Sequence, residues 1–382
     1  MMRRRNVTAA VAAALCVSTA AALAADLPAA ARQAAPVPPA MAATITQYVN
    51  AQIDVVLGPD AKAAGIARDE LARQTETSPA VTPSADFRAA YVSAIEANLP
   101  KLLKSSRVGH RLAGAIVVTR VAKATSLSSL EDEIILLMND SSPAVALWGV
   151  KGARAVVPGV LSLKARLGNQ KLTENVVTAV TRHPGTGALV QEAYAALDVS
   201  AAQPPVPPAG LVVGTQATLA LLEARIGEYV KGMPSAPMAD RDPPLYFGKT
   251  PVNSAIDAKE KVRVVQALCN LMSVSAERLI DRGGTERQEL MLVAQGAAGA
   301  LIVQMQIAGS TPANEAQATA AIAALKPVRD LDRQLPAQIK AVVDGAVAAI
   351  KAVPQFTALK NAPAVQPLAV AAPAGAVLPA GG

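Results

Sequence analysis

The sequence LSSLEDEIILLMNDSSPAVALWGVKGA, residues 127–153, predicts two helices joined by a short turn. Apolar residues recur at helical spacing from Leu127 to Met138, and the acidic residues 131–133 fall on the opposite side. Ser142 is a favourable N-cap, and Pro143 stands in the first turn of the second helix, where its missing N–H costs nothing. The stretch therefore indicates a helical hairpin.

The composition extends this prediction to the rest of the chain. Of the 382 residues, 52% are hydrophobic but only 2% are aromatic, because alanine supplies much of the apolar content. Alanine has a high helix propensity and a weak strand propensity. We therefore expect an all-α fold, and not a β-sandwich, a barrel or a parallel sheet.

Residues 1–24 are typical of a secretory signal peptide. Three arginines at positions 3–5 precede an apolar stretch, Val7–Ala21, and the small-x-small sequence Ala22-Leu23-Ala24 suits cleavage. Cleavage would lower the formal net charge from +7 to +4 by removing these arginines. The sequence thus predicts export to the periplasm or the extracellular space, with no transmembrane anchor in the mature chain.

Changes in composition divide the remainder of the chain into segments. Runs rich in alanine and proline bury little surface and rarely fold. We expect a flexible leader at 25–40, a first helical region at 41–199, a Pro-rich linker at 200–210, a second helical bundle region at 211–352 and a disordered tail at 353–382.

Two segments of the first helical region are similar to each other. Pro143–Ala153 (PAVALWGVKGA) and Leu189–Leu197 (LVQEAYAAL) both place a valine near the start and small residues at helical spacing, and Val108–Val117 (VGHRLAGAIV) is a poorer third copy. Over about residues 85–199 this pattern resembles HEAT or armadillo-type repeats, although Ala146 and Gln191 replace the family's common arginine. The resemblance implies an irregular α-solenoid of helical hairpins that offers a surface for protein binding. An irregular helical bundle remains the alternative.

The sequence contains few residues of the kinds used in catalysis. It has two histidines, and only Cys269 remains after cleavage, because Cys16 lies in the leader. Cys269 lies in an apolar helical stretch, which favours a buried, inert thiol. No zinc-ligand cluster, Walker loop, EF-hand loop or nucleophile elbow occurs. We therefore expect no catalytic residue, metal or cofactor, and the low aromatic content argues against nucleic-acid binding.

One candidate interaction surface is a basic cluster. The cluster consists of Lys101, Lys104, Arg107, His110 and Arg111. It could bind an anionic partner, or it could be a solvated helix end where basic residues suit the helix dipole.

Two further candidates involve aromatic residues. The long loop Gly232–Asn253 holds Asp240 and Asp242, which could offer oxygen ligands to calcium, and Tyr246 and Phe247, which could form an adhesive patch. The alternative is a surface loop pinned by Phe247 in a crevice. Trp148, the one tryptophan, most simply fills a gap between helices, but on the inner face of a solenoid it would anchor a partner.

These observations favour an exported, non-catalytic helical protein that acts as a protein-interaction scaffold. Two alternatives remain open. One is an envelope-associated binder of anionic polymers or lipids, which the residual positive charge suggests. The other is an all-helical enzyme with a carboxylate-based site, because such a site leaves no fixed spacing in the sequence.

Overall fold

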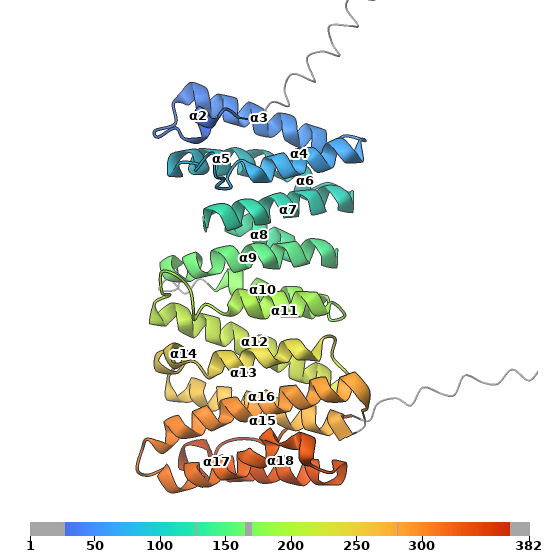
Figure 1. Cartoon of the computed structure of the whole chain (residues 1–382), viewed down its shortest axis with the longest axis vertical. Helices are drawn as coiled ribbons and strands as arrows, with labels where there is room; N and C mark the ends of the chain where they lie inside the picture. The colour runs from blue at the N-terminus through green and yellow to red at the C-terminus, as the bar shows by residue number, and fades with distance from the viewer. Residues whose placement is uncertain (1–26, 127, 165–169, 281, 367–382) are drawn as a thin grey trace, which may run out of the picture. The chain divides into compact units, whose positions relative to one another are not determined.

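The computed structural model describes residues 27–126, 128–164, 170–280 and 282–366 (Figure 1). Throughout these residues the regular secondary structure is helical, without a β-strand, which confirms the predicted all-α class. The signal peptide predicted at 1–24 lies outside the described residues. The chain divides into two compact units, Met1–His183 and Pro184–Gly382, called unit 1 and unit 2 below.

Unit 1 consists of helices that pack against their neighbours along the chain. α3 packs on α4, α4 on α7, and α7 on α9, while α8 and α10 pack on α9 and on each other. In Figure 1, α4, α7 and α9 follow one another as a layer. The helices are α2 (Ala29–Arg32), α3 (Pro39–Leu57), α4 (Ala61–Arg73), α5 (Ala85–Asn98), α6 (Pro100–Leu103), α7 (Val108–Thr125), α8 (Glu131–Met138), α9 (Pro143–Lys164) and α10 (Lys171–Arg182).

Small residues allow the helices of unit 1 to approach closely. A Cβ atom added at Gly149 of α9 would lie 2.6 Å from the backbone nitrogen of Met138 at the end of α8. A Cβ added at Gly152 would lie 3.2 Å from Cγ1 of Ile134. Glycine is therefore required for the observed contact between α8 and α9 at position 149, where the obstacle is backbone.

The segment before α3 packs on unit 1, although the sequence predicted a flexible leader. Leu27 and Ala31 are buried. The guanidinium group of Arg32 donates hydrogen bonds to the carbonyl oxygens of Gln74 (3.1 Å) and Glu76 (2.9 Å), which follow α4. These two contacts hold the segment in place, although its composition predicts no regular structure.

Unit 2 is built around α15, which packs against α12, α16 and α18. α16 also packs on α17, and α17 on α18. The helices are α11 (Gly187–Leu197), α12 (Pro208–Lys231), α13 (Asp242–Phe247), α14 (Thr250–Ala255), α15 (Ala258–Ile280), α16 (Gly284–Gly309), α17 (Glu315–Arg329) and α18 (Pro336–Lys351), with 3-10 turns η4 (Pro237–Arg241), η5 (Leu331–Arg333) and η6 (Pro354–Phe356).

Two boundaries of unit 2 differ from the predicted ones. The unit begins at Pro184, before the predicted linker at 200–210, because α11 packs on α12 and η4 and because Val199 and Val206 are buried. Residues 353–366, predicted as part of a disordered tail, contribute buried side chains at Phe356 and Leu359. The composition predicted the wrong boundaries here, because a few apolar side chains suffice to anchor a Pro-rich segment.

Three described helices are long and apolar enough to cross a membrane by length and composition. They are Pro143–Leu163, Pro208–Lys231 and Gly284–Gly309, and 56%, 67% and 50% of their most apolar windows are buried. That the mature chain has no membrane anchor stays a prediction. In this fold, at least half of each apolar window packs against other helices.

Candidate functional site

Asp240, for which the sequence left calcium binding open as one of two interpretations, lies in the interior of unit 2. Its carboxylate accepts hydrogen bonds from Arg225 of α12, from Nε to Oδ1 at 3.1 Å and from Nη2 to Oδ2 at 2.8 Å. Both side chains have no exposed surface. Arg225 also donates to the carbonyl oxygen of Ser235 (2.7 Å) and to Glu228.

Two tyrosines complete the environment of this ion pair. The hydroxyl of Tyr194 donates to Oδ1 of Asp240, and that of Tyr229 donates to Oδ2, both at 3.0 Å. Burial, together with the nearby Asp240 carboxylate, raises the pKa of both tyrosines well above the usual value. Burial alone would lower the pKa of Arg225, but the adjacent Asp240 carboxylate raises it. Since both carboxylate oxygens of Asp240 already accept hydrogen bonds from these donors, Asp240 is a structural residue. Its interpretation as a calcium ligand is wrong.

The predicted aromatic patch is also buried. Tyr246 and Phe247 pack edge to face, with ring centroids 5.5 Å apart, and neither forms a surface. The carbonyl oxygen of Phe247 accepts hydrogen bonds from the amides of Asn253 (2.8 Å) and Gln304 (2.9 Å). Phe247 is thus pinned in a crevice, as the alternative interpretation held. The loop itself is largely helical, because η4, α13 and α14 occupy most of it.

The same loop presents a different set of residues at a groove. This groove, with a volume of about 530 Å³, lies between α13 and the middle of α16. Leu245 of α13 lines it and is 63% exposed. Gly296 and Gly299 of α16 form part of the floor, and a Cβ atom added at either would meet open space. The groove therefore combines an exposed apolar side chain with a flat stretch of helix.

Cationic side chains surround this groove. Arg241 of η4, Lys249 and Arg329 of α17 all line it. Across the part of the chain that the structure describes, neither Arg241 nor Arg329 forms an ion pair. Lys249 pairs with Asp198 at 2.7 Å, and its hydrogen bond lowers the pKa of that carboxyl against the opposing effect of burial. Two arginines thus remain available to an anionic group in the groove.

The basic cluster predicted from the sequence is largely occupied by contacts within unit 1. Arg111 forms a two-point ion pair with Asp140, with Nε–Oδ2 at 2.7 Å and Nη2–Oδ1 at 3.2 Å, and it is only 15% exposed. Its Nη1 also donates to the carbonyl oxygens of Ser105 and Ser106. Arg111 is therefore a structural residue that joins the turn before α7 to the turn before α9, and its assignment to a free anion-binding surface is wrong.

The other members of the cluster differ in exposure. Lys101 lies 3.7 Å from Asp54 and donates to Asn50, and Nδ1 of His110 lies 3.0 Å from the hydroxyl of Ser105. Lys104 and Arg107 are exposed. Lys104 is the C-cap residue of the short helix α6, which agrees with the simpler interpretation of the cluster. Arg107 is the N-cap residue of α7, where the helix dipole does not favour a cation.

Trp148 lies half-buried on α9. The ammonium of Lys151, one turn further on, lies 4.9 Å from the centre of its ring, a cation–π contact. The backbone carbonyl of Trp148 accepts a hydrogen bond from Thr119 of α7 at 2.7 Å. The structure places Trp148 in unit 1, and the groove lies in unit 2.

The described residues offer little for nucleophilic or metal chemistry. Burial raises the pKa of the Cys269 thiol to about 12. Within the described ranges, no group of three or more histidine, cysteine, aspartate or glutamate residues is arranged to hold a metal ion. Asp242, the second predicted calcium ligand, is exposed, whereas Asp240 is buried, so the two carboxylates do not share a site.

The loop singled out from the sequence lines the groove, but with side chains other than those the sequence singled out. Sequence reasoning missed Arg241, which stands between the two aspartates, and it missed Arg329 and the two glycines of α16. The sequence Asp240-Arg241-Asp242 could have indicated Arg241 in part, since three consecutive charged residues are typical of a polar surface. No protein-family model, curated protein or solved structure matches the chain, so the geometry of these residues is the basis for assigning a function.

Proposed function

We propose that this protein is an exported, non-catalytic binding protein whose groove in unit 2 holds an acidic, amphipathic segment of a partner protein. The observation that carries the proposal is the groove between α13 and α16, where Arg241 and Arg329 are free of ion pairs beside the exposed Leu245. The signal peptide predicted from the sequence of residues 1–24 supports the proposed location outside the cytoplasm.

The composition of the groove favours a segment with both apolar and acidic side chains. Leu245, Leu292 and Val303 supply apolar surface, and burying such side chains contributes about 25 cal/mol per Å². Gly296 and Gly299 allow a partner backbone to approach closely. Carboxylates of the partner would pair with the two arginines, which also favours the correct orientation and fast association.

The architecture of unit 1 supports a scaffold role of the HEAT-like kind. α8 and α9 form a helical pair, and Arg111 of the preceding helix α7 binds Asp140 in the turn of that pair. Such contacts between successive pairs are what a repeat architecture requires, because each pair buries its apolar face on the next. The repeat assignment is part of the proposal.

The test measures binding of a defined peptide to the full chain. A fluorescein-labelled peptide that repeats Leu-Glu-Glu-Leu should bind, and the affinity should fall with added salt because Arg329 is exposed and Arg241 is partly exposed. The double variant R241A/R329A should weaken binding about tenfold, since each exposed pair contributes about 0.2–1 kcal/mol. L245A should weaken it independently through lost apolar contact.

Matched controls separate the groove from general charge effects. The variant K259A/R333A removes two exposed cations that do not line the groove and should bind the peptide as the wild type does. A peptide with lysine in place of glutamate should bind much more weakly. Equal affinity for the two peptides, or equal loss in the control and groove variants, would refute the proposal.

A further inference from the structure

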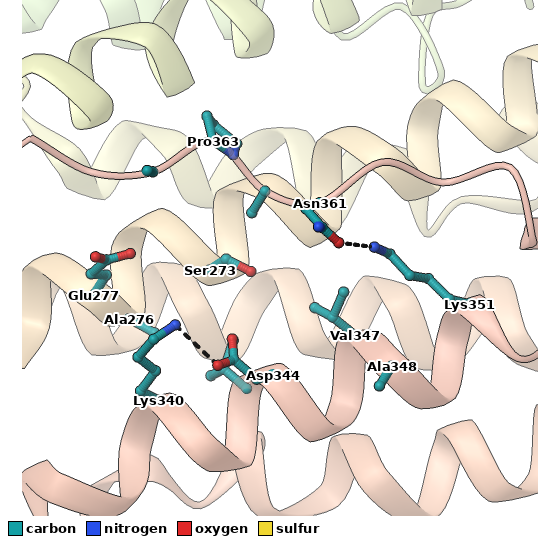
Figure 2. Close-up of a pocket in the computed structure, with 13 residues that line it drawn as sticks. Ser273, Ala276, Glu277, Lys340, Asp344, Val347, Ala348, Lys351, Asn361 and Pro363 are labelled. Atoms are coloured by element: carbon teal, nitrogen blue, oxygen red, sulfur yellow. Dashed lines mark hydrogen bonds and ion pairs between the residues drawn. The ribbon is translucent and has the colours of Figure 1, made fainter.

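A second cavity in unit 2 lies between α15, α18 and the C-terminal segment 361–364 (Figure 2). It has a volume of about 620 Å³. α18 supplies one complete face, and the apolar part of that face consists of Val343, Val347 and Ala348. Pro363 covers the cavity from the C-terminal segment. The middle of the cavity is therefore largely apolar.

The length of the cavity can be estimated from α18. Lys340 and Lys351 line its two ends and, at 1.5 Å rise per residue, lie roughly 16 Å apart along the helix. An extended peptide advances about 3.3–3.6 Å per residue. Roughly four to five residues of extended chain would span the cavity.

The two ends of the cavity carry opposite net charge. At one end Lys340 pairs with Asp344 at 3.0 Å, and Glu277 of α15 adds a second carboxylate, which leaves an excess of one negative charge. At the other end Lys351 donates to the neutral side chain of Asn361, which leaves its positive charge unbalanced. Figure 2 shows Glu277 and Lys351 on opposite sides of the cavity. This polarity matches a ligand with an ammonium group at one end and a carboxylate at the other.

The C-terminal segment is held at both ends by hydrogen bonds to its backbone, and between them the side chain of Asn361 accepts from Lys351. The backbone amide and carbonyl of Lys360 bind the side chain of Gln266 at 2.6 and 3.2 Å. The carbonyl of Gln366 accepts from the buried Arg278 at 2.8 Å, and its amide donates to Val230 at 2.8 Å. Among the described residues, the amides of Ala362 and Ala364 donate no hydrogen bond. This segment, called the strap below, thus lines the cavity and carries two backbone amides without a hydrogen-bond partner among the described residues.

We propose that this cavity binds a short peptide that has free, charged termini and small apolar side chains. Its terminal ammonium lies at Glu277, its carboxylate lies at Lys351, and its backbone pairs with the strap at Ala362 and Ala364. Backbone pairing with an extended segment is an established mode of peptide recognition. The carboxylate of a fatty acid would pair with Lys351, but a fatty acid has no group that would pair with Glu277 or accept from the amides of Ala362 and Ala364. This site is separate from the groove at α13, so it does not depend on the function proposed above.

Isothermal titration of the full chain with tetraalanine tests the proposal. The peptide with free termini should bind, and acetylation of its amine or amidation of its carboxylate should each weaken binding about tenfold, because each removes one charge-assisted contact. E277Q should abolish the penalty for acetylation, and K351Q should abolish the penalty for amidation. Hydrogen exchange should show protection of the Ala362–Ala364 segment on binding.

Control variants and a competing ligand make the result decisive. E315Q and K326Q neutralise exposed charges outside the cavity and should bind tetraalanine as the wild type does. Equal binding of free and doubly capped tetraalanine would overturn the proposal. So would binding of dodecanoate without binding of tetraalanine, or absence of binding by either.

Discussion

Replacing Asp240 by asparagine is expected to destabilise unit 2 by about 3–5 kcal/mol, the usual cost of breaking a buried ion pair by removing one charge. The substitution keeps the shape of the side chain. It places an amide NH2 where a carboxylate oxygen now accepts from Arg225 and from a tyrosine hydroxyl.

The magnitude follows from the environment of Arg225. Its side chain has no exposed surface, so its charge cannot be solvated once Asp240 is neutral. The remaining acidic partner, Glu228, is 25% exposed and contacts a different guanidinium nitrogen, so it compensates only in part. Y194F removes a single hydrogen bond and should cost only about 1 kcal/mol.

Hydrogen exchange of peptides from α12 and α15 at increasing urea concentrations measures the free energy of opening within unit 2. D242N is the matched control, because it makes the same chemical change two residues away at an exposed position and should alter the free energy by less than about 0.5 kcal/mol. The reasoning is refuted if D240N and D242N differ by less than about 1 kcal/mol.

Two further predictions concern unit 1, whose urea unfolding can be followed by the fluorescence of Trp148. G149A should destabilise unit 1 by about 1–3 kcal/mol, because the added Cβ would meet the backbone of Met138 at 2.6 Å. The control G65A should stabilise unit 1 by about 0.5–1 kcal/mol, because that site in α4 is open. Equal effects of the two substitutions would contradict the packing argument. Burial opposes ionisation of Asp140, but hydrogen bonds from Arg111 and from the Ser142 amide outweigh the effect of burial and lower the pKa of the carboxyl. The stability that the ionised carboxylate contributes is therefore present above the unfolded pKa of about 4. This stability is lost as the pH falls through the lower pKa of the folded state. The stability difference between wild type and D140N should therefore shrink between about pH 5 and pH 2, and a constant difference over that range would disprove the role of the ion pair.

The helical elements were largely predictable from local sequence. The second helix of the opening stretch begins at Pro143 as expected and continues to Lys164. Its length was not predictable from local sequence, because proline usually interrupts a helix and Pro158 here lies inside α9. The described parts of the leader (27–40) and of the tail (353–366) differ from the prediction, because their anchoring depends on contacts with residues far away in the chain, such as Arg32 with Gln74 and Arg278 with Gln366.

The candidate site was predictable only as a region. Asp240 and Asp242 belong to the same residue type in the same loop, yet one is buried and the other is exposed. The difference comes from Arg225 and Tyr194, which lie 15 and 46 positions away in the sequence. No local pattern contains that information.

By itself, the sequence determined that this protein is helical, because alanine-rich segments with caps and apolar spacing have that preference at short range. Tertiary structure alone decided which charged residues are paired and which are free. Arg111 pairs with the partly buried Asp140 and Arg225 with the fully buried Asp240, whereas Arg241 and Arg329 form no ion pair among the described residues. The physical reason is that an ion pair depends on distance in space and on desolvation, and both are set by how the helices pack.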